Sequence, residues 1–149
     1  MCCVFPEGKT TCIRGRSGCG KTTLIRLLLG LDIPDKGKIE GISDRKISAV
    51  FQEDRLCENL SAASNIRLVC TETISDRELE EAYKAVALTE VWQKPVRELS
   101  GGMRRRVSIL RALLADSDCV IMDEPLRGLD EKPEQKQLII FKKRPRERH

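Results

Sequence analysis

The sequence predicts an α/β fold in which a parallel sheet is covered by helices on both faces. Apolar runs typical of buried strands alternate with segments of helical periodicity. Stretches rich in Gly and Pro separate these segments, and no internal repeat interrupts their alternation. The 149 residues, 40% hydrophobic and 34% charged, suffice for one domain with one core.

The first part of the chain predicts a strand, a helix and a second strand. Thr10–Arg14 follows a turn signal at Pro6 and Gly8 and is expected to form the first strand. A glycine-rich loop leads from this strand into a helix predicted at Thr22–Leu31. After a stretch rich in Gly, Pro, Asp and Lys, the β-branched apolar run Lys46–Phe51 predicts the second strand.

The middle of the chain, over about residues 53–99, predicts a helical subdomain inserted into the α/β fold. Ser75 and Glu78 have the spacing of a capping box, in which each side chain bonds the other residue's backbone N–H at a helix start. The helix is expected to continue to about Glu90, because apolar side chains recur at helical spacing at Leu79, Ala82 and Val86.

A further helix is predicted between Ser100 and the acidic closing stretch Asp116–Asp118. Arginines lie off its apolar side, at Arg104, Arg105 and Arg111. The apolar stripe itself consists of Met103, Val107, Leu110, Leu113 and Leu114. A strand typical of a buried sheet follows at Cys119–Met122.

Several protein classes are excluded or disfavoured by composition. The longest apolar runs, such as Leu138–Phe141, are far shorter than the roughly 18 residues that a membrane-spanning helix needs. The segment Met1–Gly8 lacks the basic and apolar regions of a signal peptide, so a cytoplasmic location is expected. The seven cysteines are odd in number and contain no CxxC pair, which favours reduced thiols over a disulfide scaffold.

The formal net charge is +4, and much of the excess lies in a basic tail at residues 142–149. Such a tail can contact nucleic acid or anionic lipid, but the pattern favours a solvated chain end, and no nucleic-acid partner is expected.

The clearest chemical motif is the pattern GxxxxGK[ST] at Gly15–Thr22, placed between a predicted strand and a predicted helix. Glycines let backbone N–H groups turn inward, and the helix N-terminus adds partial positive charge, so phosphate oxygens can be cradled. Lys21 is expected at the β- and γ-phosphates, and the Thr22 hydroxyl is expected to ligate Mg²⁺. The predicted nucleotide-binding residues here are Gly15, Arg16, Ser17, Gly18, Cys19, Gly20, Lys21, Thr22 and Thr23.

Two acidic residues, Asp123 and Glu124, follow the buried strand at Cys119–Met122. They therefore lie at the carboxyl edge of the predicted sheet, where ligand sites of α/β proteins form. Asp123 is expected to hold Mg²⁺ through water, and Glu124 is expected to be the catalytic residue that polarises the attacking water.

The sequence Leu99-Ser100-Gly101-Gly102-Met103 resembles the signature motif of ATP-binding cassette (ABC) proteins. Its chemistry repeats that of the phosphate loop, because Ser100 caps a helix while Gly101 and Gly102 expose backbone N–H groups to an anion. Gln52, after an apolar strand, resembles the family's Q-loop, which implies a catalytic and Mg²⁺-contacting role. Leu129-Asp130 resembles its D-loop.

This resemblance covers about Phe5 to Leu138, and the residues around Gln52 are similar to importer cassettes of the nitrate, sulfonate and taurine group. It implies a P-loop ATPase that binds Mg²⁺ and ATP as a head-to-tail pair with a second ABC domain. It also implies membrane permease partners at the inner face of the cell membrane. Two alternatives stay open: a truncated or decayed cassette without effective hydrolysis, and a soluble, non-transport ABC ATPase.

Departures from the family pattern predict a cassette that is incomplete at both ends. Fourteen residues precede Gly15, so Phe5 lies too close to serve as the family's adenine-stacking aromatic residue. The single histidine, His149, is assigned to the tail rather than to the family's switch position. Leu138–Phe141 is assigned to the helix after the D-loop, which leaves the sheet without its strand between the P-loop strand and the Asp123 strand. ATP hydrolysis near background is expected on this reasoning.

Overall fold

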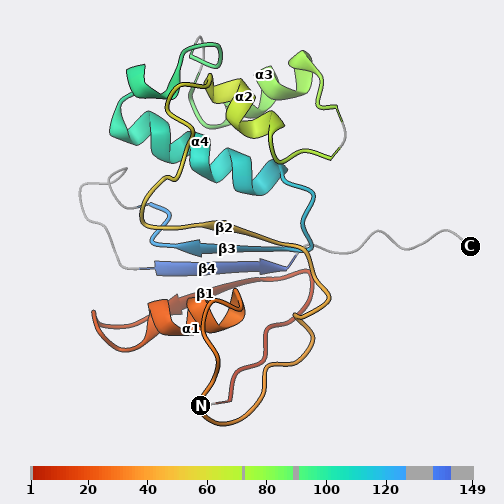
Figure 1. The fold of residues 1–149 in the computed structure, drawn as a ribbon, viewed down its shortest axis with the longest axis vertical. Coiled ribbons are helices and arrows are strands. Elements are labelled where there is room, and N and C mark those ends of the chain that lie inside the picture. The colour runs from red at the N-terminus through yellow and green to blue at the C-terminus, as the bar shows by residue number, and fades with distance from the viewer. Residues whose placement is uncertain (1, 72, 89–90, 127–135, 142–149) are drawn as a thin grey trace, which may run out of the picture.

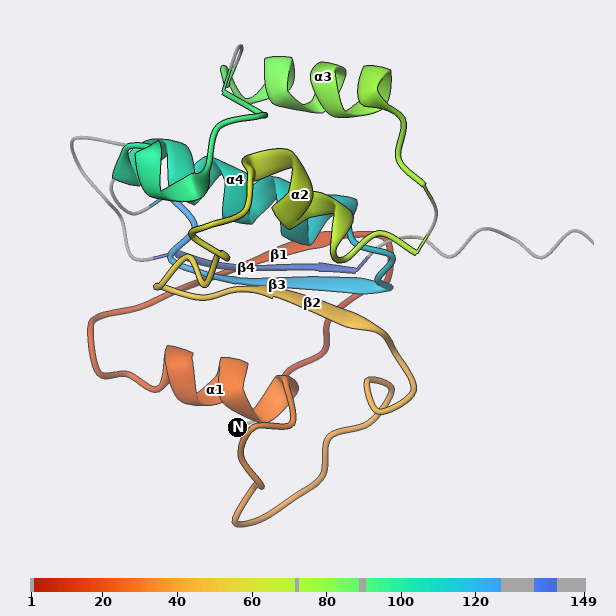
Figure 2. The same cartoon turned by 45° about the horizontal axis from the view of Figure 1, so that its top comes forward.

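The computed structural model describes residues 2–71, 73–88, 91–126 and 136–141, and it shows one sheet with helices on both faces. Helix α1 (Lys21–Leu28) lies on one face, and α4 (Gly101–Leu114) covers the other (Figure 1). Helices α2 (Ala62–Arg67) and α3 (Asp76–Ala85) lie on the α4 side, and Figure 2 shows α3 farther from the sheet than α4. The predicted α/β class is confirmed.

The sheet has four strands in the order β1-β4-β3-β2. Its first three strands in the chain are β1 (Thr10–Arg14), β2 (Ile47–Val50) and β3 (Cys119–Asp123). All three match the predicted strands to within one residue at each end. β2 and β3 pair in parallel, and β4 (Lys136–Phe141) pairs antiparallel with both β1 and β3. The first three strands therefore run in the same direction, as predicted.

The prediction that Leu138–Phe141 belongs to a helix is wrong, because these residues form part of β4. Leu138–Phe141 lies in this strand and not in a helix, and the position between β1 and β3 is filled. Ile139 is paired with Thr11 on one side and Ile121 on the other. A short continuous apolar run is typical of strands buried on both faces, and a strand here satisfies backbone groups of both neighbours. The premise for expecting background hydrolysis is therefore wrong.

Two helices end earlier than their apolar periodicity predicts. Helix α1 ends at Leu28 rather than Leu31, because Gly30 adopts a φ of 67° and Leu31 N–H bonds back to Arg26 O. Helix α3 ends at Ala85 rather than near Glu90 through the same Schellman arrangement, with Ala87 at φ 53° and Leu88 N–H bonded to Tyr83 O. Side-chain periodicity continues past both positions, but the left-handed residue ends the helix.

The two helix starts predicted from serine caps, at Ser75 and Ser100, are confirmed. The capping box at α3 is complete: Ser75 Oγ accepts from Glu78 N–H at 3.3 Å, and Glu78 Oε2 accepts from Ser75 N–H at 2.9 Å. The Ser75 hydroxyl also donates to Glu78 Oε2 at 2.6 Å, and this bond, together with the one from Ser75 N–H, holds the pKa of the Glu78 carboxyl below its usual value. Ser100 caps α4 by accepting a hydrogen bond from Met103 N–H at 3.3 Å.

Apolar side chains form separate clusters on the two faces of the sheet. Ile25 and Leu28 of α1 pack under Cys119 and Ile121 of β3. On the other face, Ala112 of α4 packs on apolar residues of β2 and β3. A third cluster, built from residues 62–110, joins α2, α3 and the 3-10 helix η1 (Val96–Glu98) to α4. The helical layer therefore has a core of its own, which α4 connects to the sheet.

The apolar stripe predicted for α4 is partly wrong. Val107 and Leu110 are buried as expected, but Leu113 is 39% exposed. Arg105, which the stripe excluded, is only 4% exposed. The reason is that α4 packs on the sheet and also on α2 and α3, so its buried side is wider than one apolar stripe. Across the part of the chain that the structure describes, no helix combines the length and apolarity required to cross a membrane.

Three predicted features lie outside the described residues. They are the D-loop at Leu129 and Asp130, the basic tail at residues 142–149, and His149 within that tail.

The position of β4 gives a test of the fold. Ile139→Pro should lower the free energy of unfolding by about 1–3 kcal/mol or more, because proline removes a backbone N–H between two paired strands and leaves a buried acceptor unsatisfied. Ile139→Val keeps the backbone and is the matched control. Chemical denaturation of both variants is the measurement, and equal stabilities would contradict a central β4.

Candidate functional site

The loop between β1 and α1 has the backbone geometry of an anion cradle. Gly18 and Gly20 have φ values of 77° and 92°, which L side chains rarely adopt. Gly20 is the N-cap of α1, and it offers no side-chain cap; the first turn of α1 also contains no acidic residue. The N-terminal N–H groups of α1 and its partial positive charge therefore face the loop without a neutralising side chain.

Lys21 places a buried cation at this loop. Lys21 is the first residue of α1, and it is only 7% exposed. Its Nζ donates to Gly15 O at 2.8 Å and to Arg16 O at 2.9 Å. Cys19 Sγ lies 3.8 Å from the same nitrogen. The loop backbone thus holds the ammonium group at the helix N-terminus, where it adds a full charge to the partial charge of the helix.

A hydrogen bond joins the loop helix to the end of β3. Thr22 Oγ1 donates to Asp123 Oδ2 at 3.3 Å, although the two residues are 101 positions apart in the sequence. Asp123 is 4% exposed and is the last residue of β3. A hydroxyl and a carboxylate are oxygen ligands of the kind that Mg²⁺ prefers. This pair therefore fits the magnesium site that the sequence predicts.

One cavity of about 200 Å³ brings together three separate segments of the chain. The phosphate loop and α1 form one wall, Gln52 comes from the segment after β2, and Glu124 comes from the segment after β3. Both predicted catalytic residues thus face the predicted phosphate loop. The lining residues are Ser17, Gly18, Gly20, Lys21, Thr22, Thr23, Gln52 and Glu124.

Other predicted residues lie near this cavity or away from it. Gly15, Arg16 and Cys19 belong to the loop but do not line the cavity. Gly15 contributes by its lack of a side chain, because a Cβ there would lie 2.6 Å from Cys19 Sγ. The signature residues Ser100, Gly101 and Gly102 are also absent from the lining. They lie at the start of α4, across the sheet from α1.

The segment after β3 has an unusual backbone conformation. Glu124 has a φ of 47°, in the left-handed region, and the next residue, Pro125, is buried. Positive φ is uncommon for residues other than glycine, asparagine and aspartate, and it persists where the surroundings hold it. This conformation turns the chain at the point where the predicted catalytic carboxylate enters the cavity lining.

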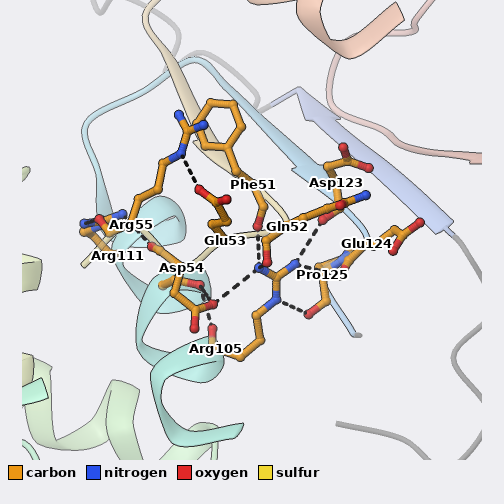
Figure 3. A network of polar contacts seen from close by, with 11 residues as sticks. Phe51, Gln52, Glu53, Asp54, Arg55, Arg105, Arg111, Asp123, Glu124 and Pro125 are labelled. Atoms are coloured by element: carbon orange, nitrogen blue, oxygen red, sulfur yellow. Dashed lines mark hydrogen bonds and ion pairs between the residues drawn. The ribbon is translucent and has the colours of Figure 1, made fainter. Parts of the chain in front are cut away.

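The buried Arg105 side chain is the residue that the sequence reasoning missed. In Figure 3 its guanidinium lies between the Gln52 segment and the Asp123–Pro125 segment and bonds to both. A signal was present in the sequence: Arg105, Ser108 and Ala112 recur at helical spacing, and all three are buried. Two small residues in line with an arginine indicate a side of α4 that packs closely on another element.

The comparisons with known proteins agree on one family. A family model described as ABC transporter matches residues 3–127. The aliphatic sulfonates import ATP-binding protein SsuB 1 of Rhizobium johnstonii is 39% identical over 139 residues, covering 85% of this chain and 50% of the relative. The trehalose/maltose import ATP-binding protein MalK of Thermococcus litoralis is 36% identical, covering 85% of this chain and 39% of the relative. The chain thus spans half or less of the length of these relatives.

Solved structures show the same fold. An RNase-L Inhibitor structure has a TM-score of 0.64 and 30% identity, covering 76% of this chain and 22% of that one. An archaeal ribosome recycling factor, solved in complex with the ribosomal stalk protein aP1, has a TM-score of 0.65 and 31% identity, covering 78% and 22%.

Cys19 provides a chemical test of the cavity, since it is exposed within the loop. Its alkylation rate should fall about tenfold when Mg²⁺ and ATP are present at about ten times the dissociation constant, because occupied loops exclude the reagent. Cys57 is also exposed but lies between β2 and α2, outside the phosphate loop, so its rate should not change. Mass spectrometry of labelled peptides is the measurement, and equal Cys19 labelling with and without nucleotide would refute the site.

Proposed function

The chain belongs to the ABC transporter family, and from this membership we propose that it binds Mg²⁺ and ATP and hydrolyses the nucleotide to drive solute import. The observation that carries the proposal is that Gln52, Glu124 and the loop that holds Lys21 line one cavity. Three chain segments, far apart in sequence, contribute to it. ATP binding itself is supported by the names of the relatives, which are ATP-binding proteins of importers.

The phosphate loop, Lys21, Thr22, Gln52 and Glu124 at the cavity, together with Asp123 bonded to Thr22, have distinct proposed tasks. Backbone N–H groups of the loop and of the first turn of α1 bind phosphate oxygens, and the Lys21 ammonium neutralises charge on the β- and γ-phosphates. Thr22, Gln52 and Asp123 would hold Mg²⁺, which supplies charge neutralisation at the phosphates when bound. Glu124 orients and polarises the attacking water.

We assign Ser100, Gly101 and Gly102 to the nucleotide of a second cassette. They begin the 14-residue helix α4, Ser100 and Gly101 are exposed, and a Cβ at Gly101 would meet only open space within 4 Å. An uncrowded helix N-terminus can receive an anion from another molecule. Because these residues do not line this chain's own cavity, a head-to-tail pair of cassettes is the arrangement that uses both motifs.

We propose that the chain acts as one cassette domain with a helical subdomain at about residues 53–99, bound to membrane permease subunits at the cytoplasmic side. Importer relatives at 36–39% identity support this role. They are named for different solutes, so the proposal includes no single substrate.

Structural likeness to a ribosome recycling factor keeps a soluble role as the second candidate. Co-purification with permease subunits supports import, and co-purification with ribosomes supports the soluble role.

The role of Lys21 is tested by Lys21→Ala. ATP affinity should fall about ten- to hundredfold, because hydrogen bonds to charged groups contribute about 1.5–3 kcal/mol each. Lys36 is exposed and absent from the cavity lining, so Lys36→Ala is the matched control. Titration calorimetry is the measurement, and an unchanged ATP affinity in Lys21→Ala would contradict the assignment of Lys21 to phosphate binding.

Glu124→Gln tests the catalytic carboxylate. Phosphate release should fall by about 10²–10⁴, the usual contribution of a general base, while ATP affinity stays near that of the parent chain. Glutamine is nearly isosteric with glutamate and keeps one carbonyl oxygen as an acceptor, so the fold should persist. Glu98→Gln on η1, which is exposed, is the control. Retained turnover in Glu124→Gln would remove the residue from the proposed role.

A further inference from the structure

We propose that Arg105 is a positioning residue that fixes the Gln52 segment against the Asp123–Pro125 segment, so that Gln52 and Glu124 face one cavity. The proposal rests on the function proposed above, because it assigns Arg105 a task in bringing together the two predicted catalytic residues. Arg105 itself does not line the cavity and acts only through the backbone.

The contacts of Arg105 divide between the two segments, as Figure 3 shows. Toward the end of β3, its Nε donates to Pro125 O at 2.9 Å, and its Nη2 donates to Asp123 O at 3.0 Å and Glu124 O at 2.7 Å. Toward the segment after β2, its Nη1 donates to Phe51 O, to Gln52 O at 3.5 Å and to Asp54 Oδ1 at 3.5 Å. One guanidinium thus binds the carbonyls of both predicted catalytic residues.

The carbonyl groups that Arg105 binds lie at or just beyond the ends of β2 and β3. β2 ends at Val50 and β3 ends at Asp123, so the carbonyls of Phe51, Glu124 and Pro125 lie beyond the strand ladders. Carbonyls removed from water require donors, and Arg105 supplies donors to all three, through one buried bond to Pro125 O and two partly buried bonds. The bond to Glu124 O also acts at the residue with φ 47°. Arg105 therefore fixes the backbone of the two segments that follow β2 and β3.

The position of Arg105 is itself fixed by α4 and by an ion pair. Its side chain is 5% exposed, and the Asp54 carboxylate opposite it is 26% exposed. Ser108, one turn along α4, donates its hydroxyl proton to Arg105 O at 2.8 Å, and its Oγ lies 3.5 Å from Asp54 Oδ1. Arg111 donates to Asp54 O at 3.2 Å and to Arg55 O at 2.8 Å. Helix α4 therefore holds residues 51–55 at several points, but within this group of contacts only Arg105 also reaches the end of β3.

The planar shape of the guanidinium is what this task needs. Arginine presents five N–H donors in a rigid fork, and these donors point to both segments at once. Lysine keeps the positive charge but concentrates its three donors on one nitrogen, so it cannot span the two segments in the same way. Arg105→Lys therefore separates positioning from charge. Arg106→Lys is the matched control, because its Nη1 contacts Ala87 O in the helical layer at 3.4 Å.

The experiment compares these two variants in the whole chain. In Arg105→Lys, the maximal rate of phosphate release should fall about a hundredfold, the effect of misplacing reacting groups by about 1 Å. ATP affinity should change by less than about threefold, because Lys21 and its loop are untouched. Independently of turnover, amide hydrogen exchange should rise in residues 51–55 and 123–126 and stay unchanged in α3. Arg106→Lys should show neither change.

Several results would overturn the proposal. They are unchanged exchange in both segments, a rise of exchange across the whole chain, or a parallel fall in ATP affinity and melting temperature. Arg105→Gln, which removes the charge, provides a second variant; unfolding of both variants would show a folding role instead of positioning. A parent chain that binds no ATP would refute the proposed function, while the exchange comparison would still decide whether Arg105 fixes the two segments.

Discussion

The common direction of β1, β2 and β3 is the constraint on which the site depends. Because these strands run the same way, their carboxyl ends lie at one edge of the sheet, and the segments that follow them meet there. The phosphate loop, Gln52 and Glu124 each follow one of these strands. Strand β4 lies between β1 and β3 and runs opposite to both. Two antiparallel pairings in succession restore the parallel relation, so the shared edge is kept.

Buried charges at this edge are stabilised mainly by backbone atoms. Lys21 is bound by the carbonyls of Gly15 and Arg16, and Arg105 is bound by carbonyls from two segments. Each cation is therefore paired with dipoles of fixed position, which offsets the cost of taking it out of water. Asp123, which is also buried, accepts a hydrogen bond from Thr22. These charges lie where the chain leaves its strands, and their hydrogen bonds connect the segments that follow the strands.

The N-termini of α1 and α4 have different surroundings, and the proposed function uses each of them in a different way. α1 begins at the cavity, and its N-cap glycine leaves the first turn open toward the loop. α4 begins at Ser100, which caps it, and its first residues are absent from the cavity lining. One molecule therefore presents the proposed phosphate-binding terminus of α1 in its own cavity, while the terminus of α4, assigned to a second cassette, lies outside that cavity. This separation favours the paired arrangement of cassettes proposed for the family member.

The sequence by itself determined the features that depend on neighbouring residues. The loop pattern, the strands β1, β2 and β3, and the helix starts at Ser75 and Ser100 all follow from local backbone preferences and capping. Only the tertiary structure decided the role of Leu138–Phe141, because an apolar run forms a strand or a helix according to the partners it meets. The burial of Arg105 and the meeting of Gln52 with Glu124 were likewise decided by packing. Hydrogen bonds between residues 20 to 101 positions apart are set by the sheet and α4, which no local pattern encodes.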